Sequence, residues 1–157
     1  MLLRKILFTS VLLALCILSA LYLRYFLLEN ELNSTQLIQL LIISLNLEYT
    51  VNTGINFGLA GEATISRQIL LAALSVLVCL GALIWGVISK SKWAVIIASL
   101  LAGGGLANAY ERIAYGGVFD YLNVSFTFFT NPYSFNLADI YIFIGAVMFI
   151  FRPQTKE

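Results

Sequence analysis

The sequence predicts an all-α membrane protein with four transmembrane helices and a small β-sheet, or cradle, on its outer surface. Of the 157 residues, 61% are hydrophobic and only 11% are charged, and the mean hydropathy is +0.93. These values lie outside the range of ordinary soluble domains. Four long stretches are apolar, and two of the segments between them alternate apolar and polar residues. The first pattern predicts the helices and the second predicts the sheet.

Each of the four apolar stretches approaches the roughly 20 residues that a helix needs to cross a hydrocarbon core of about 30 Å. Residues 6–23, 69–88 and 93–110 contain no charge, and 137–151 contains one acid, Asp139. We therefore treat the whole chain, 1–157, as a single membrane domain. The predicted spans are about 6–28, 68–89, 93–111 and 137–151, and the predicted outer segments are 29–67 and 112–136.

Charged residues divide between the two sides of a four-span arrangement. The net charge is only +1, so no basic surface indicates a nucleic-acid partner. Because bases gather in cytoplasmic loops, both termini are expected in the cytoplasm. The bases of that side are Arg4, Lys5, Lys90, Lys92, Arg152 and Lys156, and the acids of the other side are Glu29, Glu31, Glu48, Glu62 and Asp120.

The composition gives no reason to expect a metal or a cofactor. The chain has no histidine, and its two cysteines, Cys16 and Cys79, each lie inside an apolar stretch. Such isolated cysteines are typical of apolar packing, and a transition-metal site needs clustered nitrogen or sulfur ligands. We expect neither a metal site nor a disulfide.

Two outer segments carry the alternation of a half-buried strand. Residues 45–52 alternate without a break and should end at Gly54, and residues 123–128 alternate again in an aromatic-rich stretch. A small amphipathic sheet on the outer membrane surface would explain both. An interfacial aromatic belt explains the aromatics equally well. The aromatic side chains concerned are Phe119, Tyr121, Phe129 and Tyr133.

Two acids are predicted at the same membrane depth. If the third span runs outward, Glu111 lies near its outer end, and Asp139 lies near the outer end of the fourth span. Two close carboxyls in a low-dielectric site share one proton, so they could act as general base and general acid on a bound water, as in aspartic proteases. Alternatively, Glu111 pairs with Arg112 or another base, and Asp139 caps its helix. Spacing alone leaves both interpretations open.

Four short motifs occur in order along the chain. The motifs are Asn52-Thr53-Gly54-Ile55-Asn56-Phe57-Gly58, Gly103-Gly104-Gly105-Leu106-Ala107-Asn108-Ala109-Tyr110-Glu111-Arg112, Tyr115-Gly116-Gly117-Val118-Phe119-Asp120 and Phe135-Asn136-Leu137-Ala138-Asp139. They resemble the Asn-x-Gly-x-x-Phe, Gly-Gly-x-x-Gly-Asn-x-x-Asp-Arg, Val-Asp and Phe-Asn-x-Ala-Asp boxes of the lipoprotein signal peptidases, which are membrane aspartic proteases (signal peptidase II, peptidase family A8). Order, spacing and the four-span layout all agree with that family.

The resemblance implies an endopeptidase that cleaves the signal peptide of a prolipoprotein immediately before the lipid-modified cysteine. It implies a multi-pass protein of the bacterial cytoplasmic (inner) membrane with its active site at the outer face. The expected partners are diacylglyceryl-modified prolipoprotein substrates and membrane lipids. No cofactor or nucleic acid is implied, and we expect a monomer.

Transferred residue by residue, the resemblance makes Glu111 and Asp139 the catalytic dyad. The remaining motif residues would bind substrate or support the dyad. Asparagine side chains can both donate to and accept from a peptide, and an arginine offers several donors without titrating. Asp120 is expected to orient the outer loop. The supporting residues are Asn52, Gly54, Asn108, Arg112, Asp120 and Asn136.

The chain departs from the family pattern at a few positions. Glu111 stands where the family has Asp, and Ala107 replaces a family glycine. Ala20 stands where the family usually has an acid, four residues before a base. A catalytic constellation tolerates only about 0.5 Å of misplacement, so the extra methylene of Glu111 bears on activity. A cleavage-deficient paralogue that binds lipoprotein precursors or lipids is therefore a second hypothesis. A small transporter that uses the intramembrane acids for ion passage is a third.

Overall fold

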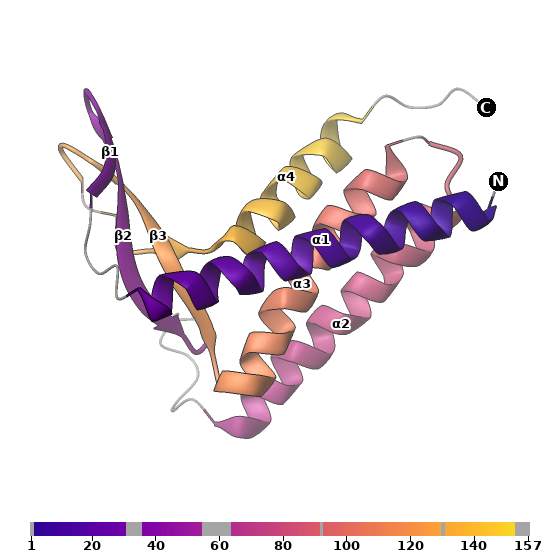
Figure 1. The fold of residues 1–157 in the computed structure, drawn as a ribbon, viewed down its shortest axis with the longest axis horizontal. Coiled ribbons are helices and arrows are strands. Elements are labelled where there is room, and N and C mark those ends of the chain that lie inside the picture. The colour runs from indigo at the N-terminus through magenta and orange to yellow at the C-terminus, as the bar shows by residue number, and fades with distance from the viewer. Residues whose placement is uncertain (1, 31–35, 55–63, 92, 130, 153–157) are drawn as a thin grey trace.

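The computed structural model describes residues 2–30, 36–54, 64–91, 93–129 and 131–152. Within them the chain forms a bundle of helices with a small antiparallel sheet across one end (Figure 1). The elements in order are α1 Leu2–Glu29, β1 Gln36–Leu40, β2 Ile43–Asn52, α2 Ile65–Ile88, α3 Ala94–Tyr115, β3 Val118–Phe126, β4 Ser134–Phe135 and α4 Leu137–Phe151.

Three of the helices are long and apolar enough to cross a membrane. They contain 28, 24 and 22 residues for α1, α2 and α3. At about 1.5 Å per residue, even the shortest exceeds the 30 Å hydrocarbon core. The apolar helix α4 has 15 residues, or roughly 22 Å by the same rise. The sequence predicts four spans; the structure gives three candidates and one shorter apolar helix.

Helix α3 forms the centre of the bundle and contacts each of the other three helices. Its glycines allow this close packing, because there is no room for a Cβ at successive positions. A Cβ on Gly103 would meet Cys16 of α1, one on Gly104 would meet the Ala138 carbonyl of α4, and one on Gly105 would meet Cys79 of α2. Small residues permit such contacts between helices in lipid.

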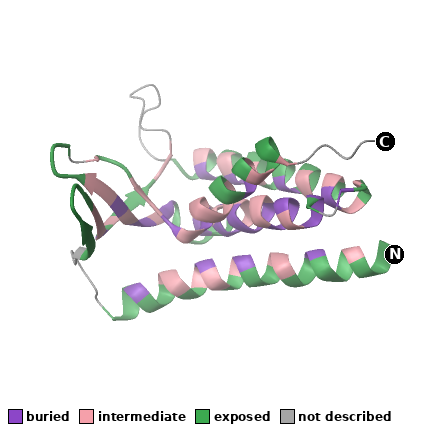
Figure 2. Cartoon of the chain, turned by 90° about the horizontal axis from the view of Figure 1, so that it is seen from above, coloured by how far each residue is buried: buried purple, intermediate pink, exposed green. Residues whose placement is uncertain are grey.

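Helix α1 lies along the side of the bundle (Figure 2). Its buried residues, Thr9, Cys16, Ala20 and Leu27, recur at intervals of seven and four residues. This spacing places them on one stripe of the helix. Most of the other α1 side chains are exposed and apolar, which suits a helix whose outer face contacts lipid acyl chains.

The sheet is four-stranded and antiparallel, in the order β1-β2-β3-β4. The prediction of a strand at 45–52 is confirmed by β2. The second predicted strand, at 123–128, is correct in place but begins too late, because β3 starts at Val118 and includes Phe119 and Tyr121. Those two aromatics therefore belong to the sheet, and Tyr121 is buried with Leu27 beneath it.

The sheet lies at the end of the bundle opposite the start of α1 and the end of α4 (Figure 1). At that opposite end, the Lys5 side chain donates to the carbonyl oxygens of Val87 and Ser89, where α2 ends. A lysine is favourable at a helix C-terminus, since the unpaired carbonyls there carry partial negative charge. The contact holds the start of α1 beside the end of α2.

Candidate active site

A tight turn between α3 and β3 places the last turn of the helix next to the sheet. Gly116 has φ +75° and its N–H donates to the Arg112 carbonyl oxygen, a left-handed C-terminal cap that favours glycine. Only Gly117 separates it from Val118, where β3 begins. The turn therefore brings the end of α3 close to the first residues of β3, which include Asp120.

The start of α4 is fixed by a capping box. The Asn136 side chain accepts from the Asp139 N–H at 3.0 Å, and the Asp139 carboxylate accepts from the Asn136 N–H at 3.1 Å. This reciprocal arrangement satisfies two backbone donors of the helix end. Asp139 thus caps its helix, as one of the two sequence interpretations expects. Its second oxygen, Oδ1, takes no part in the cap.

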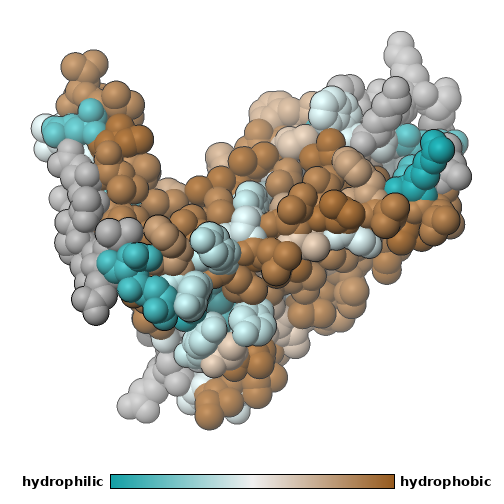
Figure 3. Space-filling model, viewed as in Figure 1, coloured by the Kyte–Doolittle hydropathy of each residue, from teal (hydrophilic) through white to brown (hydrophobic). Residues whose placement is uncertain are grey.

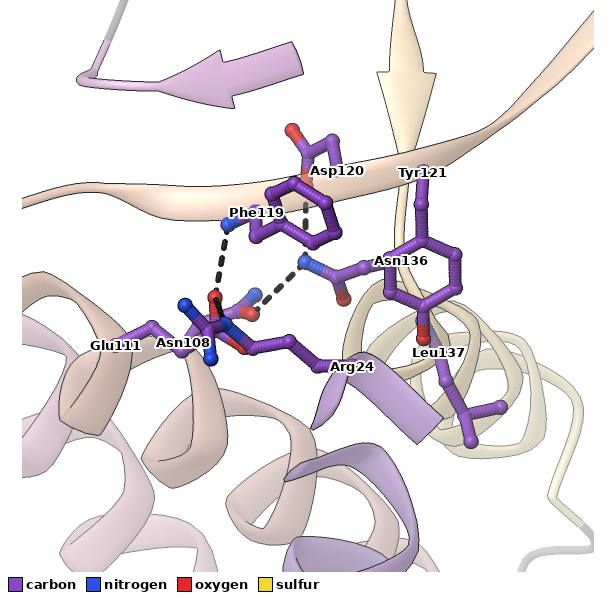
Figure 4. A network of polar contacts seen from close by, with 8 residues as sticks. All are labelled: Arg24, Asn108, Glu111, Phe119, Asp120, Tyr121, Asn136 and Leu137. Carbon is purple, nitrogen blue, oxygen red and sulfur yellow. Dashed lines mark hydrogen bonds and ion pairs between the residues drawn. The ribbon is translucent and has the colours of Figure 1, made fainter. Parts of the chain in front are cut away.

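Asn136 contacts two carboxylates at once. Its backbone N–H donates to Asp139 Oδ2, and its side-chain Nδ2 donates to Asp120 Oδ1 at 2.9 Å. The bond to Asp120 is drawn in Figure 4. Because one residue binds both groups, the two carboxylates are close neighbours, although they come from β3 and α4. Asn136 and Asp120 are 3% and 2% exposed.

Two further asparagines complete this network. Asn52 Nδ2, at the end of β2, donates to Asp120 Oδ2 at 3.1 Å. Asn108 Nδ2, on α3, donates to Asp139 Oδ1 at 2.8 Å, while its own oxygen accepts from Asn136 at 3.1 Å. Every carboxylate oxygen of Asp120 and Asp139 therefore has a donor. The five residues come from β2, α3, β3, the β4–α4 junction and α4.

A cavity of about 330 Å³ opens beside Asp120. Its wall combines the end of β2, the last turns of α3 and the segment before α4. Asp120 and Arg112 supply charged groups to it, and Asn52 supplies an amide. The other lining residues are Thr50, Val51, Gly54, Leu71, Pro132, Tyr133 and Ser134.

Burial raises the pKa of Asp120 from its ordinary value of 3.8 to about 6. The donors from Asn52 and Asn136 oppose this shift, and the neighbouring Asp139 carboxylate adds to it. An acid with such a pKa beside a second carboxylate can hold a proton that its neighbour lacks. The site therefore has the two ingredients of general acid and base catalysis.

Glu111 has a different environment. Its carboxylate pairs with Arg24 Nε of α1 at 3.4 Å and accepts from the Phe119 N–H at 2.8 Å (Figure 4). Glu111 is 4% exposed, and of the three acids only Asp120 is among the residues that line the cavity. The sequence alternative in which this glutamate pairs with a base is therefore realised, and the base is Arg24.

The Arg24 guanidinium also stacks on aromatic rings. Its central carbon lies 3.8 Å from the centre of the Tyr115 ring and 5.7 Å from that of Phe119. A guanidinium over an aromatic face gains cation–π attraction. Arg24 thus ties the outer end of α1 to the end of α3 and to β3, around Glu111.

A second polar chain fixes the other wall of the cavity. Arg112 Nη1 donates to Gln68 Oε1 at 3.0 Å, and Gln68 Nε2 donates to the Thr53 carbonyl. Gly54 follows with φ +121°, a conformation that favours glycine, and its N–H donates to Asn52 Oδ1 at 3.0 Å. The end of β2 is thereby tied to α2 and α3.

The structure brings five of the predicted site residues into one hydrogen-bonded network: Asn52, Asn108, Asp120, Asn136 and Asp139. Arg112 and Gly54 border the cavity beside it. Glu111 lies next to the network and is paired with Arg24. The remaining part of the first motif, 55–58, lies outside the described residues.

Sequence reasoning misses three contributors. Gln68 is buried at the start of α2, Arg24 pairs with Glu111, and the Tyr121 hydroxyl accepts from the Leu137 N–H at 3.0 Å. A glutamine beside a charge-free apolar span is a signal for Gln68, because polar groups inside a membrane need partners. Tyr121 fits an aromatic belt equally well and gives no such signal.

Comparison with known proteins identifies the family. The family model of signal peptidase (SPase) II matches residues 11–153, which is most of the chain. The chain belongs to the signal peptidase II family. The predicted resemblance is thus confirmed. The family is that of peptidase A8, so the chain is grouped with proteases.

Individual relatives agree with this assignment. A lipoprotein signal peptidase of Aeromonas hydrophila is 34% identical over 118 residues, which cover 71% of this chain and 70% of the relative. One of Rhodopseudomonas palustris (strain TIE-1) is 38% identical over 104 residues, or 64% of this chain. The match spans 63% of the length of that relative.

Two solved structures of bacterial membrane enzymes share the signal peptidase II chain's fold. One matches with a TM-score of 0.68 over 95% of this chain and 93% of its own, and the other with 0.70 over 90% and 89%. Both are 17% identical to this chain, so the likeness concerns the fold.

Two of the departures of this signal peptidase II member from the family pattern are in one place. Ala20 and Ala107 belong to one buried cluster with Ala138 of α4. Arg24, the base four residues after Ala20, pairs with Glu111 instead of with an acid on its own helix. The methyl group of Ala107 packs within the cluster. Three alanines join α1, α3 and α4 directly below the network.

Proposed function

We propose that this signal peptidase II member is a membrane endopeptidase in which Asp120 and Asp139 form the reacting pair. The observation that carries the proposal is the double contact of Asn136, whose backbone and side chain bind the two carboxylates. Asp120 borders the cavity, and burial raises its pKa to about 6. The sequence hypothesis pairs Asp139 with Glu111 instead, and the two assignments predict different variants to be inactive.

The two carboxyls have complementary environments. Asp139 lies in the first turn of α4, where the helix dipole favours negative charge. Asp120 is buried and favours its neutral form up to about pH 6. Asp139 would take a proton from water as the water oxygen bonds to the scissile carbonyl carbon, and Asp120 would donate its proton to the carbonyl oxygen. When the C–N bond breaks, Asp139 passes its proton to the leaving amine and Asp120 recovers its own.

Glu111 then acts as a positioning residue. It accepts from the N–H of Phe119, the residue immediately before Asp120. Its carboxylate is also held by Arg24 at 3.4 Å. The side chain fixes the start of β3 against α1 and α3, and a glutamate can fill this role as an aspartate does if its neighbours adjust.

The substrate is proposed from the relatives, which carry the name lipoprotein signal peptidase. The protein would remove the signal peptide of a diacylglyceryl-modified prolipoprotein before its lipid-modified cysteine. The site lies where the sheet meets the ends of the spans, so a bond close to the membrane surface is within reach. The bases Lys5 and Arg152 lie near the opposite end, and by the positive-inside rule they support a proposed arrangement with both termini in the bacterial cytoplasm.

Cleavage by the purified protein in lipid tests this function. The substrate is a diacylglyceryl-modified precursor, and the control is the same precursor without lipid. We expect cleavage of the modified precursor at the residue before its cysteine, little cleavage of the unmodified one, and none by Asp139→Asn. Binding of the modified precursor without any product would instead support a cleavage-deficient paralogue.

A further inference from the structure

The far end of the sheet carries an exposed apolar cluster. The β1–β2 turn and the turn that follows β3 lie together there, because the Thr127 N–H donates to the Ile42 carbonyl oxygen at 3.0 Å. We call this cluster the apolar tip. Its members with their exposed fractions are Leu40 (67%), Leu41 (97%), Ile42 (55%), Ile43 (42%), Phe128 (79%) and Phe129 (54%).

The sequence around the tip is free of charge. No charged residue occurs between 32 and 47 or between 121 and 138. An exposed apolar cluster without charges is unfavourable in water, and soluble proteins rarely expose one. Charged side chains are also the usual protection of a sheet edge in water, and none is present in these two stretches.

The turn itself departs from the usual chemistry of a hairpin. Leu41 has φ +42°, and it is the one non-glycine among the described residues with a positive φ. Asparagine or glycine adopts this conformation at lower cost, and both are the common hairpin residues. A strained position occupied by a fully exposed leucine indicates a role for that side chain other than forming the turn.

The tip is placed beside the spans. Figure 1 shows the β1–β2 hairpin running across the helix ends and past the bundle on the side of α4. Figure 3 shows the molecule notched between the hairpin and the helices, with hydrophobic surface on both sides of the notch. The outer face of α4 is itself exposed and apolar, for example at Phe143 and Ile144. The tip therefore continues the surface that faces lipid.

We propose that the apolar tip inserts into the lipid leaflet next to α4 and anchors the sheet that forms the cavity wall. The occupant of this surface is the interfacial layer of a bilayer, where aromatic and aliphatic side chains are favourable. The sequence predicts only a sheet on the membrane surface, whereas the exposed residues of the tip identify the part that is embedded. β2 runs from the tip to Asn52 at the cavity, so the anchor would hold that wall in place.

Nitroxide labels in a reconstituted bilayer test the proposal without any measurement of activity. In a Cys16→Ala/Cys79→Ala background, single labels are placed at Leu41→Cys, at Glu48→Cys on the exposed face of β2, and at Leu15→Cys on the exposed face of α1. Collision rates with oxygen and with a water-soluble nickel chelate are compared. We expect the Leu41 label to favour oxygen like the Leu15 label, and the Glu48 label to favour nickel.

A second arm separates anchoring from folding. Leu41→Gly/Ile42→Asn places a glycine at the position of positive φ, which the turn favours, and removes two apolar side chains. We expect a label at Phe128→Cys to move toward the nickel-accessible side in this variant, with the melting temperature in detergent unchanged or higher. An unchanged depth overturns the proposal, as does a Leu41 label that favours nickel. Spin–spin broadening between Leu41 labels would also overturn it, in favour of contact with a second copy.

Discussion

At the residue scale, the proposed function depends on the different surroundings of two neighbouring carboxylates. Asp120 and Asp139 share the ligand Asn136 but differ in surroundings, since one is buried in β3 and the other begins a helix. Differences of this kind assign acid and base roles within a pair. Glu111 differs from both because its negative charge has a fixed partner in Arg24.

The raised pKa of Asp120 predicts a stabilising substitution. A shift from 3.8 to about 6 in the folded state corresponds to about 3 kcal/mol. Since the folded pKa is the higher one, the stabilisation is present below pH 4 and is lost as pH rises through 6. At pH 7 the ionised carboxylate is a net cost, so Asp120→Asn should raise the melting temperature while activity disappears.

Thermal unfolding of the two proteins between pH 4 and 8 checks this prediction. The difference should be largest above pH 6 and should shrink toward zero near pH 4, where the parent carboxyl is also neutral. A variant that is less stable than the parent at pH 7 would show that the charged form of Asp120 is favoured by the fold.

The pair of Arg24 and Glu111 predicts a non-additive result. Removing one partner of a buried ion pair leaves an uncompensated charge and costs about 3–5 kcal/mol. Arg24→Gln should therefore be strongly destabilising, whereas Arg24→Gln/Glu111→Gln should recover at least about 1 kcal/mol of that loss. Unfolding free energies of the two single variants and the double variant provide the cycle. Additive losses would mean that the two charges are not coupled.

At the element scale, α3 positions the site through its contacts with the other helices. Gly104 faces the carbonyl of Ala138, the residue before Asp139. A side chain there must push α4 away and move the capping box with it. Rigid elements of this kind place side chains more accurately than loops do.

Gly104→Ala is therefore expected to reduce cleavage by about 100-fold or more, since a misplacement of about 1 Å can cost that much. Gly81→Ala is the matched control, because within the described residues no atom of another element lies within 4 Å of its added Cβ. That control should keep its activity and its melting temperature. Equal effects of the two substitutions would show that helix packing at Gly104 does not set the position of Asp139.

Much of this arrangement is predictable from sequence, and the exceptions have physical causes. Apolar runs predict the helices, and alternation predicts β2, because both signals are local. The role of Glu111 is not predictable in the same way. Its position suggests an acid facing Asp139, but its direction depends on Arg24 and Phe119, which lie on α1 and β3.

The network around Asn136 depends on long-range contacts as well. The sequence places Asn136 and Asp139 in one motif, yet nothing in their spacing shows that Asp120 joins them. The turn at Gly116 and the pairing of Thr50 with Asp120 bring β3 over the helix ends. The register is irregular between Leu47 and Thr50, and such bulges redirect side chains beside active sites.

At the scale of the whole molecule, the two ends have different tasks. The sheet end holds the cavity and the apolar tip, and the opposite end holds the start of α1, the end of α4 and the contact of Lys5 with Ser89. A protein built this way can work at one membrane surface while its termini stay at the other.

This layout predicts the result of fusions to the C-terminus. A fluorescent protein that folds only in the cytoplasm should be bright after Glu157, and an alkaline phosphatase that needs export should be inactive there. Fusions at both termini should agree, since the start of α1 and the end of α4 lie at the same end of the bundle. An active phosphatase after Glu157 would mean that α4 does not cross the membrane. Its 15 residues are fewer than the roughly 20 that a span needs.

The most direct test of the central claim compares Asp120→Asn with Glu111→Gln in the cleavage of a diacylglyceryl-modified precursor. With Asp120 and Asp139 as the reacting pair, Asp120→Asn should lose about 10³-fold or more of kcat, as removal of a general acid does. Glu111→Gln is destabilised by the unpaired Arg24, but its folded fraction should lose about 10-fold or less, because its amide oxygen can still accept from Phe119. If Asp120→Asn stays active while Glu111→Gln is folded and inactive, the reacting pair is Glu111 and Asp139, and the assignment of Asp120 as the general acid is wrong.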